Sequence, residues 1–199
     1  MSIVVFILVA ILAYFIGAIP FGLIYARIRG VDIRKTGSGN IGATNVARQF
    51  GFMGGFVPIF LLDMMKGALP VLAVFLAGVN GFDKDIAMLI TGVLAILGHT
   101  FPIYLKFKGG KGVATTAGVF LVIAPIPFLV AFAIFLLLYA TTKVVAIGSI
   151  TAAFCLPFAV YFLAPGRTIV FIVSIVLAAL LIFLHRSNIA RLINGEKKK

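Results

Sequence analysis

The sequence predicts an all-α polytopic membrane protein, a seven-transmembrane-helix bundle formed by a single domain over residues 1–199. Of the 199 residues, 63% are hydrophobic and only 11% are charged, and the mean hydropathy is +1.24. Soluble domains are much less apolar, and a helix needs about 20 apolar residues to cross a bilayer. The chain contains several such runs, separated by glycine-bearing polar segments.

The first apolar run, Ile3–Ala26, lacks a basic leading region and is long enough to span. We therefore expect a helix that is retained, because a cleaved signal peptide has a basic start and a shorter apolar core. Gly17, Pro20 and Gly22 fall near the end of the run and predict a kink there.

The second run, Phe52–Val79, contains two opposite charges, Asp63 and Lys66. Residues three apart share one helix face, and an unpaired charge inside a membrane is costly. We therefore predict a structural ion pair, with the wall of a polar site as the alternative. The other clear spans are predicted at Ile86–Gly98, Val144–Ala164 and Thr168–Leu184.

The stretch Val113–Thr142 is apolar but is interrupted by Pro125 and Pro127. It is too long for one regular span and too short for two. We predict two short helices that turn at residues 124–127. A re-entrant hairpin is the alternative, and it would leave the flanking loops on the same side of the membrane.

The net charge of +12 arises from 17 basic and 5 acidic residues. The basic residues lie between apolar spans, so the positive-inside rule and an anionic substrate explain them better than nucleic-acid binding. If Val113–Thr142 crosses twice, only Lys84 and Arg167 lie opposite the basic loops, and Lys66 lies within the membrane. We therefore expect the N-terminus outside and the C-terminus, with all three polar segments, in the cytoplasm.

The first polar segment, Gly37–Arg48, is rich in glycine, hydroxyl and carboxamide groups. Glycine lets backbone N–H groups approach a ligand closely, and the arginine guanidinium suits phosphate or carboxylate. The segment is typical of an anion-binding loop, although an ordinary ordered connector has a similar composition. The candidate ligand-binding side chains are Ser38, Asn40, Thr44, Asn45 and Arg48.

The second polar segment, His99–Gly112, ends in four residues, Gly109–Gly112, before a helix predicted from Val113. Glycines and a lysine at a helix N-terminus favour a phosphate site. The segment is not a Walker A loop, because Leu105 stands where the first glycine should be. A plain basic turn would explain the lysines but not the glycines. We expect phosphate contacts from Arg48, Lys106 and Lys111.

The third polar segment begins at His185, and Asn188 follows three residues later. Both side chains can face inward from the end of the last span, although a histidine at this position can also be a helix cap. The usual acyltransferase His-x4-Asp pair is missing, because Tyr104 and Ala190 stand five residues after the two histidines. No spacing typical of metal ligands is present, so we expect no metal and no cofactor.

These three segments, in this order, resemble the motifs of the bacterial acyl-phosphate:glycerol-3-phosphate acyltransferase family of phospholipid synthesis. The resemblance covers the whole chain, including its length and hydropathy. The residues that carry it are Gly37–Asn45 with Arg48, Gly98–His99 with Lys108–Thr115, and His185–Ile189 with Arg191, Gly195 and Glu196.

The resemblance implies a multi-pass enzyme of the bacterial inner membrane that transfers a fatty acyl group from acyl phosphate to glycerol 3-phosphate. It implies a site facing the cytoplasm, catalysis by Ser38 and Arg48, activity from His185 and Asn188, and a structural role for Glu196. It also implies glycerol 3-phosphate binding by Gly109–Gly112. Besides the two substrates we expect membrane lipid as partner, no nucleic acid, and a monomeric chain. Our catalytic set is Ser38, His185 and Asn188, and our substrate-binding set is Asn40, Thr44, Asn45, Arg48, Lys106, Gly109, Gly110, Lys111 and Gly112.

Two other functions are compatible with basic loops in a membrane protein. An anion transporter would place charge along a path through the bilayer, whereas the predicted spans hold only Asp63 and Lys66. A membrane phosphatase or phosphotransferase would also need phosphate loops on one face. For acyl transfer, the base is either His185 or the phosphate of the acyl donor, and we favour the substrate's phosphate.

Overall fold

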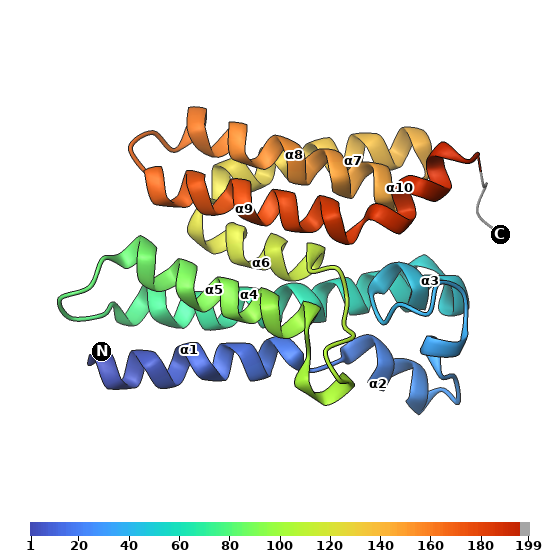
Figure 1. Cartoon of the computed structure of the whole chain (residues 1–199), viewed down its shortest axis with the longest axis horizontal. Coiled ribbons are helices and arrows are strands. Elements are labelled where there is room, and N and C mark those ends of the chain that lie inside the picture. The colour runs from blue at the N-terminus through green and yellow to red at the C-terminus, as the bar shows by residue number, and fades with distance from the viewer. Residues whose placement is uncertain (196–199) are drawn as a thin grey trace. The chain divides into compact units, whose positions relative to one another are not determined.

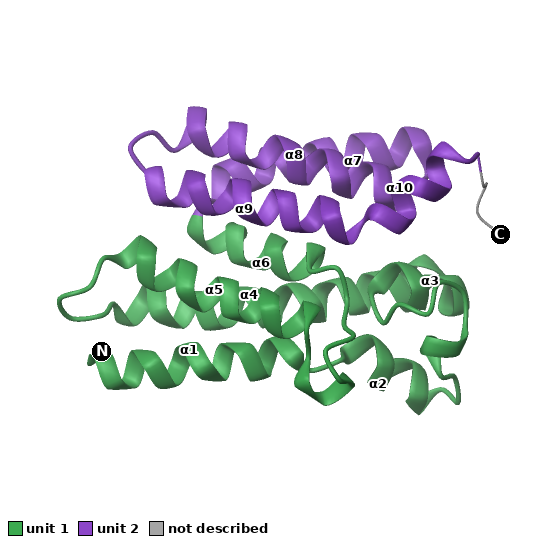
Figure 2. Ribbon diagram, in the orientation of Figure 1, with its two compact units in different colours: residues 1–123 green, residues 124–199 purple. Residues whose placement is uncertain are grey.

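The structure is a computed structural model that describes residues 1–195, and every regular element within them is helical (Figure 1). This confirms the all-α class. The chain divides into two compact units, the first from Met1 to Ile123 and the second from Ala124 onward (Figure 2).

Unit 1 is built on three long helices, α1, α4 and α5, with the shorter α6 packed on α4 and α5. Two short helices, α2 and α3, lie at the end where the first polar segment is found (Figure 1). The elements are α1 (Ile3–Ala18), α2 (Phe21–Ile28), a 3₁₀ turn (Ile33–Lys35), α3 (Ala43–Gly51), a π-helical turn (Phe52–Phe56), α4 (Val57–Ala77), α5 (Lys84–Thr100), a 3₁₀ turn (Ile103–Leu105) and α6 (Val113–Ile123).

Glycines set how closely these helices approach. A Cβ on Gly17 of α1 would overlap the backbone of Ala95 on α5, and a Cβ on Gly118 of α6 would overlap the backbone of Met64 on α4. Lipid tails are as apolar as the side chains, so the hydrophobic effect does not drive helices together inside a membrane. Small residues instead let helix backbones approach closely and gain van der Waals contact. Gly17 and Gly118 are therefore packing positions.

The predicted kink in the first span is confirmed. Helix α1 ends at Ala18, α2 begins at Phe21, and Pro20 lies between them without a backbone N–H to continue the helix. At this break the Ile19 carbonyl accepts the Phe21 N–H at 3.1 Å, and it also binds a side chain from α4, as described below.

The sequence predicts a polar loop from Arg27 to Gly51, which includes the first polar segment, and this prediction is wrong in its second half. Residues Ala43–Gly51 form α3, which continues through the π-helical turn into α4. Its apolar side chains Ala43 and Val46 are buried, whereas Arg48 is exposed. The glycines and asparagine before α3 favour a loop over the whole segment. Residues Ala43–Gly51 are nevertheless amphipathic, and they form a helix because their apolar face is buried.

Unit 2 contains three long helices and a terminal short one: α7 (Pro125–Thr142), α8 (Val145–Leu163), α9 (Thr168–Leu184) and α10 (Arg186–Ile193). Helix α8 packs against both α7 and α9. Helices α9 and α10 are bent by 55° at His185. The bounds of α9 are those predicted for the last span.

Five helical segments among the described residues are long and apolar enough to cross a membrane, or six if α9 and α10 count as one bent span. The stretch Val113–Thr142 does form two helices, α6 and α7, which meet at Ala124. Helix α7 has 18 residues and qualifies as a span, whereas α6 has 11 and is short. A multi-pass membrane protein is therefore confirmed, and the count of seven spans stays a prediction.

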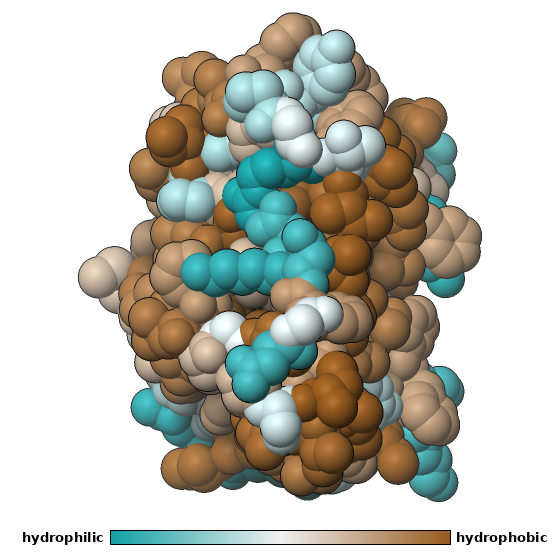
Figure 3. Space-filling model, turned by 90° about the vertical axis from the view of Figure 1, so that its left-hand side faces the viewer, coloured by the Kyte–Doolittle hydropathy of each residue, from teal (hydrophilic) through white to brown (hydrophobic). Residues whose placement is uncertain are grey.

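The surface agrees with this assignment. Brown hydrophobic surface covers much of the view in Figure 3, and hydrophilic residues form restricted patches within it. Large apolar side chains are exposed on the long helices, such as Val4 of α1 at 64% and Phe162 of α8 at 71%. Such exposure is expected where the surrounding solvent is lipid.

The glycine packing leads to a test. Gly17→Ala should force α1 away from α5, and overpacking of this kind costs about 1–3 kcal/mol, or roughly 3–10 °C in the unfolding midpoint. Gly54→Ala is the matched control, because nothing lies within 4 Å of the position of its Cβ. Thermal unfolding in detergent measures both variants. Equal midpoints for the two would contradict the packing role of Gly17.

Candidate functional site

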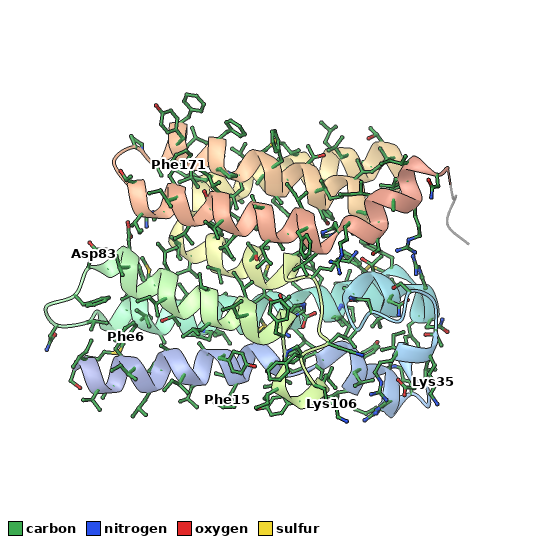
Figure 4. The ribbon with its side chains drawn as sticks, in the orientation of Figure 1. Phe6, Phe15, Lys35, Asp83, Lys106 and Phe171 are labelled. Carbon is green, nitrogen blue, oxygen red and sulfur yellow. The ribbon has the colours of Figure 1, made fainter. Side chains whose placement is uncertain are left out.

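The first two polar segments gather at one end of unit 1. Figure 4 shows Lys35, two residues before the first segment, and Lys106, from the second, at this end, with Asp83 at the opposite end of the unit. Asp83 precedes α5, so the short turn between α4 and α5 lies far from both polar segments. The basic and glycine-rich residues of unit 1 therefore form one polar end.

Asn45 organises the first segment. It is 2% exposed, and its side-chain nitrogen donates to the carbonyls of Ile33, Thr36 and Asn40 at 3.0, 3.1 and 2.9 Å. Its side-chain oxygen accepts the backbone N–H of Ser38 at 2.9 Å. A buried carboxamide that uses both its ends fixes the loop around it. Asn45 thus shapes the candidate anion loop from within.

The reactive groups of this segment lie around that amide. Ser38 is exposed, and the guanidinium of Arg48, one turn along α3, lies 3.5 Å from the Asn45 side-chain oxygen. Gly37 has a φ of +54°, and a Cβ there would overlap the Asn45 oxygen and come within 3.2 Å of the Arg48 guanidinium. The close fit requires glycine at this position. Thr44 is half-buried in the first turn of α3.

One cation just before the first segment is already neutralised. Arg34 donates to the Asp32 carboxylate from Nε at 2.9 Å and from a terminal nitrogen at 2.6 Å. These hydrogen bonds from Arg34 hold the pKa of Asp32 well below its usual value, so the carboxylate stays ionised and paired at neutral pH. Asp32 therefore contributes no free negative charge that would repel an anion.

The second segment folds back on the end of α5. The N–H groups of Gly109 and Gly110 donate to the carbonyls of Thr100 and His99 at 3.1 and 3.0 Å. Gly112 has a φ of +81° and accepts the Thr116 N–H at 2.8 Å, so α6 begins directly after the glycines, as predicted. The first turn of a helix presents unpaired N–H groups and favours anions.

The two cations of the second segment differ in position. Lys106 is exposed and has a left-handed backbone conformation with φ +52°, as does the neighbouring Phe107 with φ +62°. Lys111 is half-buried between Gly110 and Gly112. Backbone strain at non-glycine residues clusters at functional sites. The turn is therefore held in a conformation that its own side chains do not favour.

A hydrogen bond joins the two segments. The Asn40 side-chain nitrogen donates to the Gly109 carbonyl at 3.4 Å, and its oxygen accepts the Gly42 N–H at 2.9 Å. Asn40 thus connects the loop before α3 with the glycines before α6, although they are 69 residues apart. The structure brings both predicted phosphate-binding segments together in unit 1.

The ion pair predicted within the second span is confirmed. The Lys66 ammonium lies 2.9 Å from the Asp63 carboxylate, and both residues are 3% exposed. Lys66 also donates to the Ile19 carbonyl at 3.0 Å, at the break between α1 and α2, where the same carbonyl accepts the Phe21 N–H at 3.1 Å. The pair therefore has a structural role in joining α4 to the first span.

Sequence reasoning missed one neighbour of this pair. Nδ1 of His99 lies 3.8 Å from the same Asp63 carboxylate oxygen. His99 and Asp63 come from α5 and α4 and are 36 residues apart in the sequence. No local spacing could have indicated this contact, because it arises from helix packing.

The third segment belongs to unit 2. His185 is 4% exposed and lies at the bend between α9 and α10, and its Nδ1 is 2.8 Å from the Leu181 carbonyl. Since a carbonyl only accepts, Nδ1 carries the hydrogen and Nε2 is the basic nitrogen of the neutral ring. Asn188 is half-buried in the first turn of α10. Glu196 lies outside the described residues.

The polar end contains no cluster of acidic, histidine and cysteine side chains that could hold a metal, and neither does any other part of residues 1–195. The candidate chemistry is therefore that of cations, amides, hydroxyls and backbone N–H groups. Such a set binds multiply charged anions and orients them.

Comparisons with known proteins agree with this chemistry. The model of the family described as glycerol-3-phosphate acyltransferase matches residues 7–195. A relative from Geobacter sulfurreducens, named glycerol-3-phosphate acyltransferase, is 46% identical over 187 residues, which cover 94% of this chain and 93% of the relative. One from Trichlorobacter lovleyi with the same name is 42% identical with the same coverage.

Two solved structures are also similar. They are crystal structures of PlsY, an integral membrane glycerol 3-phosphate acyltransferase, in its glycerol 3-phosphate form and its lysophosphatidic acid form. The TM-scores are 0.88 and 0.85, and both structures are 38% identical to this chain and cover 98% of it and 94% of PlsY.

The role of Asn45 can be tested directly. Asn45→Ala removes the acceptor of the Ser38 N–H, and loss of a buried hydrogen bond costs about 1–3 kcal/mol, or roughly tenfold to a hundredfold in an opening equilibrium. Hydrogen exchange of the Ser38 amide should accelerate by this factor. Asn40→Ala is the control, because it leaves the Ser38 bond intact. Unchanged Ser38 exchange in Asn45→Ala would show that the loop is held by other contacts.

Proposed function

The chain belongs to the glycerol-3-phosphate acyltransferase family, and from this premise we propose that its acyl donor is a fatty acyl phosphate. The enzyme acylates glycerol 3-phosphate to lysophosphatidic acid in phospholipid synthesis. In the proposed reaction the glycerol hydroxyl attacks the acyl carbonyl, an ester bond forms, and the bond to the phosphate oxygen breaks. The hydroxyl proton passes to the departing phosphate, which is released as inorganic phosphate. Because the chain belongs to this family, we no longer consider an anion transporter or a membrane phosphatase as its function.

The observation that supports acyl phosphate as donor is the pairing of two phosphate-type segments at one end of unit 1. Asn40 links them through Gly109, and each carries its own glycines and cations. Glycerol 3-phosphate accounts for one phosphate, and an acyl phosphate accounts for a second. A thioester donor would leave the second segment without a ligand at the reacting end.

We assign the residues as follows. The turn Gly109–Gly112, with Lys106 and Lys111, binds a substrate phosphate at the start of α6. Arg48 and the loop shaped by Asn45 bind the other, with Asn40 and Thr44 contributing polar groups. Ser38 orients substrate, and His185 and Asn188 complete the proposed catalytic set. This assignment treats both units as one acyltransferase domain, which the match to residues 7–195 supports.

The proton of the glycerol hydroxyl needs an acceptor. Asp32 is paired with Arg34, so it is poorly placed to act as a base. The leaving phosphate is anionic, is already next to the carbonyl, and becomes more basic as it departs. We therefore propose substrate-assisted catalysis, in which the protein supplies orientation and stabilises the developing oxyanion.

The experiment that tests the donor compares three acyl compounds with purified enzyme and labelled glycerol 3-phosphate. Palmitoyl phosphate should give lysophosphatidic acid, whereas palmitoyl-CoA and palmitoyl carrier protein should give less than about 1% of that rate. Omitting glycerol 3-phosphate measures phosphate release alone. Comparable rates with a thioester would overturn the proposed donor while leaving the family activity intact.

The base is tested by the pH dependence of kcat. If the phosphate accepts the proton, His185→Asn and His185→Gln should lower kcat by about 10²–10³, as loss of an oxyanion-stabilising donor does, without changing the shape of the profile. A histidine base would instead give an ascending limb near pH 6–7 that both variants lose. That second pattern would make His185 the base.

We also propose seven spans, with α6 counted as one, in a monomer of the inner membrane whose polar end faces the cytoplasm. Single cysteines in a Cys155→Ala background test this topology. Lys108→Cys and Lys143→Cys should react with impermeant maleimide from one side, and Lys84→Cys from the other. If Lys143→Cys reacts together with Lys84→Cys, the residues between α5 and α8 cross only once.

A further inference from the structure

A buried contact chain runs from the membrane interior to the glycines before α6. Lys66 binds Asp63, Nδ1 of His99 faces the same carboxylate at 3.8 Å, and the other edge of the histidine ring lies against Gly110. A Cβ on Gly110 would overlap Nε2 of His99 and come within 2.7 Å of its Cε1. The imidazole therefore lies between the ion pair and the backbone of Gly110.

We propose that Asp63, Lys66 and His99 act as positioning residues for the glycine turn, Gly109–Gly112, and thereby set the affinity for glycerol 3-phosphate. This inference rests on the proposed function, in which that turn binds a substrate phosphate. None of the three touches the reacting atoms in this scheme. They act by fixing where the turn lies.

The backbone of His99 supports the same arrangement as its ring. Its carbonyl accepts the Gly110 N–H at 3.0 Å, and the next carbonyl, of Thr100, accepts the Gly109 N–H at 3.1 Å. The turn is thus held at the end of α5 by two hydrogen bonds and by direct contact with the imidazole. A rotation of the ring would move Gly110, because no side chain lies between them to absorb the shift.

The ion pair limits where the His99 ring can lie, because the Asp63 carboxylate packs against the Nδ1 edge of the ring at 3.8 Å. His99 is 5% exposed, so its ring cannot turn out to water. Asp63 is bound by Lys66, which also binds the Ile19 carbonyl at 3.0 Å. The ring is therefore packed between Asp63 on one edge and Gly110 on the other, and a shift of the ion pair would move it.

Four further buried polar atoms lie near the ion pair and the glycine turn. Nδ1 of His99 and the hydroxyls of Thr100, Thr115 and Thr116 are buried, and within residues 1–195 they make no hydrogen bond. Thr115 lies against Gly67, directly after Lys66, and Thr116 is in the first turn of α6. Buried polar atoms are costly to retain without partners, so their concentration beside the glycine turn points to a functional reason.

The expected effect is a change in KM for one substrate. A glycine turn that is displaced by a fraction of an ångström loses contacts to the phosphate it binds, and misplacement of about 1 Å can cost 10²-fold. His99→Ala should therefore raise the KM for glycerol 3-phosphate by about tenfold or more. The KM for acyl phosphate should stay within twofold of the wild-type value.

Removing one charge of the pair would leave the other unpaired and could prevent folding. The double variant Asp63→Leu/Lys66→Met avoids this, because it removes both charges together at similar volume and leaves the Ile19 carbonyl with its Phe21 N–H partner. A purely structural pair predicts a normal KM for glycerol 3-phosphate in the folded double variant. The positioning role predicts a raised KM, as in His99→Ala.

Thr91→Ala is the matched control. Thr91 is on the same helix as His99, is fully buried at 0% exposure, and bonds only within its helix, to the Ala87 carbonyl at 2.9 Å. It should leave both KM values unchanged. Initial rates of all four proteins are measured with palmitoyl phosphate and glycerol 3-phosphate, each varied in turn.

The outcomes are distinct. A selective rise in the glycerol 3-phosphate KM of His99→Ala and the double variant supports the inference. An unchanged KM for glycerol 3-phosphate in the double variant overturns it. So does an equal change in the KM of both substrates, if Thr91→Ala shows the same change. If the wild type does not turn over palmitoyl phosphate at all, the proposed donor fails, which is a separate result.

Discussion

The buried ion pair of Lys66 with Asp63 constrains unit 1, because a charge left unpaired inside a membrane helix is costly. Pro20 interrupts the first span, and at this break the Ile19 carbonyl accepts both the Phe21 N–H and the Lys66 ammonium. Asp63 neutralises Lys66 at 2.9 Å, so the cation can lie in this buried position. The ion pair thus joins α4 to the first span. The polar end is built on the part of the unit that this contact holds.

The polar end itself is organised by two carboxamides. Asn45 gathers the carbonyls of the first segment and the Ser38 N–H, and Asn40 connects this segment to Gly109. Neither side chain is charged, so both can hold the loop without competing for an anionic substrate. The cations are left at the periphery, where Arg48 and Lys106 are exposed. Scaffold contacts and the proposed substrate contacts are therefore divided between different residue types.

This division fits an acyltransferase whose substrates carry the charge. The acyl acceptor carries a phosphate, and in our proposal the acyl donor carries one too. The substrates therefore bring the negative charge, and the protein needs few carboxylates. The acidic residues of unit 1 that lie nearest to the site are each paired: Asp32 with Arg34, and Asp63 with Lys66. Pairing prevents them from repelling the substrates. It also explains how a basic site can occur without a His-x4-Asp pair.

The sequence by itself determined the membrane class, most span positions, the ion pair and the three polar segments, because these depend on hydropathy, helical spacing and local composition. It could not reveal α3, since glycine and asparagine before it favour a loop and only burial of Ala43 and Val46 makes a helix stable. It could not place Asn45 inside its loop or Asn40 against Gly109. The contact of His99 with Asp63 and Gly110 was equally hidden. These contacts join residues that are distant in the chain, so packing of α4 against α5 and of the two polar segments against each other decided them.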